Sequence, residues 1–94
     1  MEEKILTLHP EGKKGTNISK ARYDVMRQTI LDIVKADEGI TFTEMTNAVE
    51  KKLTGNFDGS IGWYATTVKL DLEARGQIER IPGSSPQQLR LGKS

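Results

Sequence analysis

The side chains in this sequence that could do chemistry are few. His9 is the only histidine, it stands beside Pro10, and there is no cysteine among the 94 residues. A metal site needs several convergent ligands, and acid–base catalysis needs a positioned partner. Asp71 and Glu73 are two positions apart, so on a helix they do not face each other and we expect a solvated edge. The sequence therefore predicts no catalytic site, no metal, no cofactor and no enzymatic activity.

The glycine-rich stretch GNFDGSIG, residues 55–62, is the one segment that could hold a phosphate. It precedes an expected helix, whose first backbone N–H groups can bind an anion. The lysine and serine that end a phosphate-binding P-loop are absent. We therefore interpret this stretch as a turn followed by a helix cap.

Charge is balanced overall and uneven along the chain. Fourteen Lys and Arg stand against thirteen Asp and Glu, giving a net charge of +1. Residues 13–27 are the basic end, with one acidic residue, Asp24, and these basic ones: Lys13, Lys14, Lys20, Arg22 and Arg27. Such a cluster is typical of a phosphate-binding surface or of a solvated loop and helix start. It would join a surface on a later helix only if the loop folds back.

The elements that must position these residues are clearest between residues 60 and 91. Apolar side chains recur at helical spacing at Ile61, Ala65, Val68 and Leu72, which predicts a helix with one buried face. Ser60 is expected to cap its start and Gly76 to end it. Alternation then predicts strands at 77–81 and 87–91, joined by a turn at Pro82 and Gly83, with Leu89 and Leu91 on the inner side.

The residues before this helix predict a strand, a loop and two more helices. We expect a short strand at 4–9, a basic loop at 11–17, and helices at 20–37 and 41–54. Ser19 is the expected cap of the first helix. Thr41 and Glu44 have the spacing of a capping box at the start of the second. Residues around Ile40 are placed to form a short bridge to the C-terminal hairpin.

This order of elements resembles a winged helix-turn-helix domain, over about residues 19–91. The most telling segment is LDLEARGQIERI, which is similar to the end of a recognition helix and the start of a wing. With HPEGKKG and FDGSIGWYATTVKLDLEARG, the whole chain also resembles a family of small bacterial proteins of unknown function. The expectation is one α+β domain over 1–94: three helices, a C-terminal β-hairpin wing, and an N-terminal strand and basic loop over 1–18.

The resemblance implies a DNA-binding or transcription-associated protein. In winged-helix DNA binders the third helix enters the major groove and the wing approaches the backbone. The residues expected to face duplex DNA are Lys13, Lys14, Lys20, Arg22, Thr66, Thr67, Lys69, Arg80 and Arg90. On the third helix, Asp71 and Glu73 cancel the charges of Lys69 and Arg75, so that helix would attract phosphate weakly.

The alternative is a protein-interaction module, homodimeric or with another partner. Trp63 and Tyr64 are adjacent, so on a helix they point about 100° apart and cannot both lie in the buried stripe. If Tyr64 packs beside Val68, Trp63 projects near Thr67 and Leu70. An apolar strip outside the core marks a protein contact more often than a base contact. Three interpretations of Trp63 stay open: packing under the N-terminal segment, a partner surface, and nucleic acid.

The sequence also suggests a compartment. Without cysteine there is no disulfide framework, and a reducing cytoplasmic location is the simplest interpretation. The first fifteen residues contain acidic side chains and no long apolar run, so we expect neither a signal peptide nor a membrane span.

Overall fold

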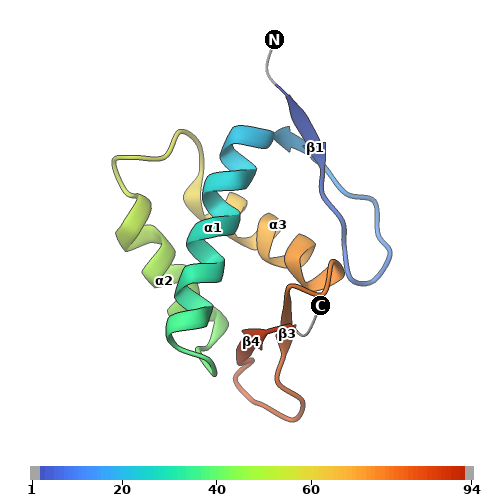
Figure 1. Cartoon of the computed structure of the whole chain (residues 1–94), viewed down its shortest axis with the longest axis vertical. Coiled ribbons are helices and arrows are strands. Elements are labelled where there is room, and N and C mark those ends of the chain that lie inside the picture. Colours follow the sequence, from blue (N-terminus) through green and yellow to red (C-terminus); the bar gives the residue numbers. More distant parts are fainter. Residues whose placement is uncertain (1–2, 93–94) are drawn as a thin grey trace.

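A computed structural model describes residues 3–92 and shows an α+β fold of three helices and two small antiparallel sheets (Figure 1). One sheet precedes the helices and the other follows them. In chain order the elements are β1 (Lys4–Leu6), β2 (Asn17–Ser19), α1 (Lys20–Ala36), α2 (Phe42–Leu53), α3 (Ile61–Ala74), β3 (Ile78–Arg80) and β4 (Leu89–Leu91).

The three helices begin where the caps predict. The Ser19 and Ser60 side chains accept hydrogen bonds from the backbone of the third helical residue of α1 and of α3, each at 3.3 Å. At α2 both halves of the capping box form, between Thr41 and Glu44. These bonds satisfy N–H groups that have no partner inside a helix. Gly76 adopts a φ of +75°, the left-handed conformation expected after α3.

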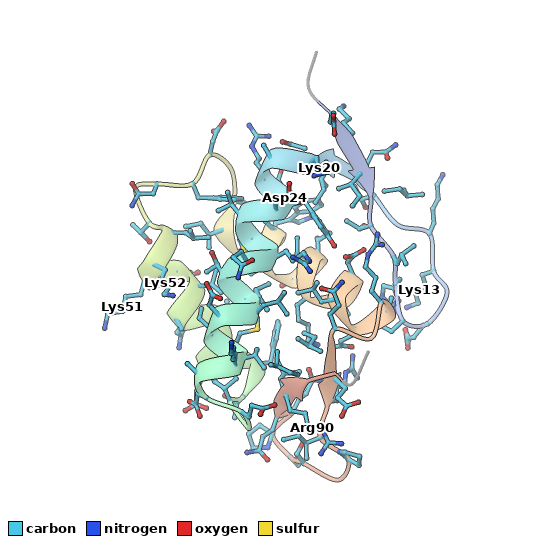
Figure 2. The ribbon with its side chains drawn as sticks, viewed as in Figure 1. Lys13, Lys20, Asp24, Lys51, Lys52 and Arg90 are labelled. Carbon is cyan, nitrogen blue, oxygen red and sulfur yellow. The ribbon has the colours of Figure 1, made fainter. Side chains whose placement is uncertain are left out.

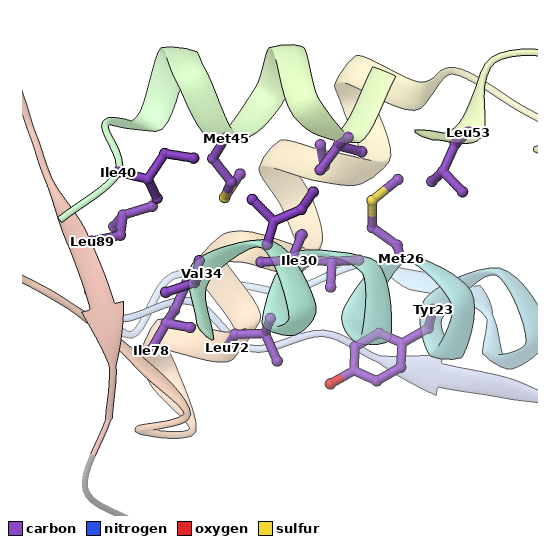
Figure 3. Close-up of a cluster of buried hydrophobic side chains, with 14 of the residues drawn as sticks. Tyr23, Met26, Ile30, Val34, Ile40, Met45, Leu53, Leu72, Ile78 and Leu89 are labelled. Atoms are coloured by element: carbon purple, nitrogen blue, oxygen red, sulfur yellow. The ribbon is translucent and has the colours of Figure 1, made fainter. Parts of the chain in front are cut away.

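The hydrophobic core lies between the three helices and the C-terminal sheet (Figure 3). Met26 and Ile30 of α1, Met45 of α2 and Leu72 of α3 are completely buried. The β3–β4 hairpin closes this core with Ile78 and Leu89, among others. The apolar face predicted for α3 is confirmed at Ala65, Val68 and Leu72, whereas Ile61 is only partly buried.

The C-terminal hairpin is tied to the start of α2, as the sequence predicts. Thr41 and Gln88 form an isolated bridge, and Gly39 and Ile40 exchange backbone hydrogen bonds with Leu89 at 2.8 and 2.9 Å. The strands are shorter than the predicted 77–81 and 87–91, with Glu79 opposite Arg90 at the centre of the register. This bridge fixes the hairpin against the helices.

The N-terminal segment differs from the prediction. The strand predicted at 4–9 ends at Leu6, and the loop predicted to run to residue 17 gives way to β2, which pairs with β1 in an antiparallel hairpin. Thr7 N–H donates to the Thr16 carbonyl at 2.9 Å, and its hydroxyl accepts from the Thr16 N–H. The sequence pattern missed β2 because three residues are too few to show alternation.

Candidate nucleic-acid and protein interface

Both functional hypotheses place contacts on the surface of α3 that faces away from the core. Ser60 caps this helix and its buried face anchors it, so the remaining side chains have fixed positions. Trp63 is 46% exposed, which confirms that it lies outside the core. We call this surface the outer face of α3, and it consists of Trp63, Thr66, Thr67 and Leu70.

The loop between β1 and β2 folds back over one part of the outer face. The Leu8 N–H donates to Asp71 Oδ1 at 2.8 Å, which holds the loop on α3. Thr67 and Leu70 line a hollow of about 110 Å³ together with Leu8 and Lys14, among others. The predicted apolar strip is therefore divided. Its Leu70 end is half-buried beside the loop, and its tryptophan end is open.

Trp63 stands at the end of an aromatic cluster. Its ring lies edge-to-face with Tyr64 at 5.0 Å, and Tyr64 meets Phe57 in the same manner at 5.2 Å. Gly59 adopts a φ of +124°, and a β-carbon there would lie 2.9 Å from the Tyr64 ring. Sequence reasoning missed Phe57, although the glycines around it indicated a tight turn. The cluster gives the indole a ring contact on Tyr64, while Trp63 stays 46% exposed.

Lys69 does not face outward as predicted, and that prediction is wrong. It is only 4% exposed. Its ammonium pairs with Glu73, donates to Gln87 Oε1 at 2.7 Å and lies 4.9 Å from the centroid of the Phe42 ring. Burial lowers the pKa of Lys69, and the Glu73 carboxylate opposes that shift. This lysine joins α3 to the β3–β4 hairpin and to α2, so it is not available to a phosphate.

Asp71 and Glu73 do not form a solvated edge either. Asp71 is completely buried and accepts hydrogen bonds from the Tyr23 hydroxyl and from Arg75 Nε, the latter at 2.9 Å. The Glu73 side chain is 6% exposed and pairs with Lys69 and with Arg80, at 3.2 Å from Arg80 Nε. Buried carboxylates need such partners. Both residues hold the fold together.

Alkaline pH should weaken the contact between Tyr23 and Asp71. Burial, together with the hydrogen bond to Asp71, raises the pKa of Tyr23 to about 12. An unfolded tyrosine ionises near pH 10, so the folded state favours the neutral phenol. Its stabilisation is complete below about pH 10 and is lost as pH rises toward 12. We expect the unfolding free energy to fall by about 2 kcal/mol over this window.

Urea denaturation of the natural chain and of Tyr23→Phe, at steps between about pH 9 and pH 12, measures this loss. The variant lacks the ionising group, so the difference between the two free energies should shrink as pH rises. A difference that stays constant across the window would contradict the buried, hydrogen-bonded phenol.

The other predicted basic contacts stand at separate places and have acidic neighbours. Figure 2 shows Lys13 on the β1–β2 loop, Lys20 at the start of α1 and Arg90 on β4, far from one another. The ion pairs are Lys13–Glu11 at 3.3 Å, Lys20–Asp24 at 2.8 Å, Arg22–Asp58 at 2.6 Å, Arg80–Glu73 at 3.2 Å and Arg90–Glu79 at 2.5 Å. Among the predicted basic contacts, Lys14 is the one without an ion pair in the described part of the chain.

Within residues 3–92, no group of three or more His, Cys, Asp or Glu side chains is placed to hold a metal ion. Over the same residues, no helix is both long and apolar enough to cross a bilayer. His9 uses its ring Nδ1 to accept a hydrogen bond from the Glu11 N–H at 3.1 Å, which is a local structural contact.

Comparison with known proteins shows a family and no activity. Residues 4–89 match the family of unknown function DUF6958, and the chain belongs to this family. Searches of curated proteins and of solved structures find no significant match.

Proposed function

We propose that this member of a family of unknown function is a winged helix-turn-helix domain that associates with a second copy of itself through the outer face of α3. The order of elements supports the fold assignment. Three helices are followed by the β3–β4 hairpin, and the bridge between Thr41 and Gln88 adds a short third pairing. In this proposal α3 stands where a recognition helix would be and the β3–β4 hairpin is the wing.

The observation that carries the functional proposal is the exposed indole of Trp63. A tryptophan is highly buried on average, and this one is 46% exposed while its ring contacts that of Tyr64. Rigid aromatic side chains are enriched at protein interfaces and dominate their energy. A second apolar part of this surface lies at Leu70 and at Leu8, which is 43% exposed. Trp63 would be the anchor of the contact.

Charge supports a protein contact over a phosphate contact. The one basic residue predicted to face outward from the middle of α3, Lys69, is buried against Glu73. A net charge of +1 leaves little repulsion between two copies. A two-fold dimer brings the same patch together from both subunits, so a single apolar anchor is used twice. Sedimentation equilibrium tests the proposal, because the mean mass should rise toward twice 10.5 kDa with concentration.

Duplex DNA is the second candidate, favoured by the arrangement of two hairpins around α3. Thr66 is exposed on the outer face, Lys14 lies on the β1–β2 loop beside Thr67, and Arg80 stands on β3 at the other side. Threonine hydroxyls can bind base edges or phosphates. This arrangement would place a helix in a groove with a basic side chain on each flank.

We expect only weak, non-specific binding to duplex DNA, with a Kd above about 10 μM at physiological salt. Most of the predicted basic contacts are already paired, and a single unpaired lysine releases few counterions. Anisotropy of a labelled duplex at about 50 and about 200 mM salt measures the affinity and its salt slope. A nanomolar affinity that falls steeply with salt and is lost in Lys14→Glu would replace self-association by DNA binding as the proposed function.

A further inference from the structure

A second surface, away from the outer face of α3, has the composition of a ligand site. An open hollow of about 460 Å³ lies where α1, the C-terminal end of α3 and the β3–β4 hairpin meet. It is lined by Arg27, Leu31, Arg75, Gln77, Leu91 and Gly92. Its volume falls within the usual range for small-molecule sites. We propose that this hollow binds a small organic anion, an oxyanion carried on an apolar body.

Each of the two arginines that line the hollow is held by hydrogen bonds from its Nε atom. Arg27 donates from Nε to Gln77 Oε1 at 3.0 Å, and Arg75 donates from Nε to Asp71 at 2.9 Å. Both guanidinium groups lie near Tyr23, where their positive charges act on its phenol. The Nε atom of each guanidinium is therefore already used in a hydrogen bond. The terminal amino groups of Arg27 have no hydrogen-bond partner in the described part of the chain.

The groups left over in this hollow are donors. The acceptor oxygen of Gln77 is already used by Arg27, so its side-chain NH₂ remains to donate. A guanidinium has donors and no acceptor, and its fork matches the two oxygens of a carboxylate or phosphate. Asp71 is the carboxylate bound to Arg75, whose charge it neutralises, and the Glu38 carboxylate accepts from the Leu91 N–H at 3.0 Å beside the hollow. Arg27 forms no ion pair in the described part of the chain, so its guanidinium is the charged group that selects for an anion.

The walls select for an apolar body on that anion. Leu31 of α1 and Leu91 of β4 both line the hollow and are only partly buried in the core. Their exposed faces would be removed from water by an aromatic or branched aliphatic group. A bare inorganic ion would leave them exposed. The site therefore combines charge recognition with an apolar contact, the usual composition of a small-ligand site.

Titration of the full chain with phenyl phosphate and with phenylacetate, followed by nitrogen NMR of the Arg27 and Arg75 Nε and Gln77 side-chain groups, tests the proposal. We expect saturable shifts with a Kd of about 1 mM for at least one of the two probes. The probe that binds more tightly distinguishes a phosphate site from a carboxylate site. Inorganic phosphate and benzyl alcohol, which lack the apolar body and the charge respectively, should each bind at least about tenfold more weakly.

Arg27→Gln should weaken binding of the preferred probe by at least about tenfold, because it removes a charge-assisted hydrogen bond. Arg90→Gln is the matched control. Arg90 lies on the β3–β4 hairpin next to Leu91, but it pairs with Glu79 and does not line the hollow. If Arg27→Gln does not fold, Arg27→Lys serves in its place. It keeps the positive charge but lacks the paired guanidinium donors, so we expect an intermediate affinity. The proposal is overturned if neither probe gives saturable shifts by about 10 mM, or if Arg27→Gln or Arg27→Lys binds like the natural chain.

Discussion

Replacing Asp71 by alanine is expected to lower the free energy of unfolding by about 3–5 kcal/mol. The Asp71 carboxylate is completely buried and joins three parts of the chain. It accepts from the Leu8 N–H of the N-terminal segment, from the Tyr23 hydroxyl of α1 and from Arg75 Nε. Alanine leaves these donors without an acceptor, and an unsatisfied buried polar group carries its full desolvation penalty. Urea denaturation measures the change.

Asp32→Ala is the control for this prediction. Asp32 is an exposed aspartate whose hydrogen bond is a local one, accepted from Gln28 at 2.8 Å. Its removal should change stability by less than about 0.5 kcal/mol. Amide hydrogen exchange at Leu8 gives a second readout, since Asp71→Ala should speed exchange there even below the unfolding transition. Equal effects of the two alanine variants would contradict a central role for Asp71.

Replacing Trp63 by alanine is expected to weaken self-association by about thirtyfold or more. The indole is the largest exposed apolar side chain on α3, and its aromatic neighbours fix its position. Truncating such an anchor typically costs at least about 2 kcal/mol of binding free energy. Stability should change much less, because nearly half of the side chain already lies in water. Sedimentation equilibrium gives the dissociation constant, and thermal unfolding checks the fold.

Val25→Ala is the matched control for Trp63→Ala. Val25 is 45% exposed, almost the same fraction as Trp63, but it lies on α1. Loss of this side chain should leave the dissociation constant within about twofold of the natural value, because the contact is assigned to α3. If both variants weaken association equally, the interaction is a general hydrophobic one. If neither does, the outer face of α3 is not the interface.

The helices could be predicted from the sequence because their signals are local. The helical spacing of apolar residues and each side-chain cap involve residues no more than four positions apart. The caps predicted at Ser19, Thr41 and Ser60 all form. Local geometry also predicted that Trp63 and Tyr64 cannot share the buried stripe, and left open which of the two is exposed; the structure shows that it is Trp63. The link between Ile40 and the C-terminal hairpin was correct as well.

The roles of Lys69 and Asp71 could not be predicted in this way. Asp71 finds its partners 48 and 63 positions earlier, in Tyr23 and Leu8, and Lys69 finds Gln87 18 positions later. A helical wheel assigns a charged residue to solvent unless a distant partner is known. The β1–β2 loop folds back onto α3 and supplies one of the distant partners of Asp71, the Leu8 N–H. Of the residues predicted for the outer surface of α3, Trp63 is therefore exposed and Lys69 is buried.

The fluorescence of Trp63, the only tryptophan of the chain, tests self-association through α3 most directly. We predict that raising the protein concentration from about 1 μM to about 1 mM shifts its emission to the blue and reduces quenching by iodide, as the indole leaves water. Val25→Ala should behave like the natural chain. The account is contradicted if emission and quenching stay constant over this range, or if they change only when duplex DNA is added at low salt.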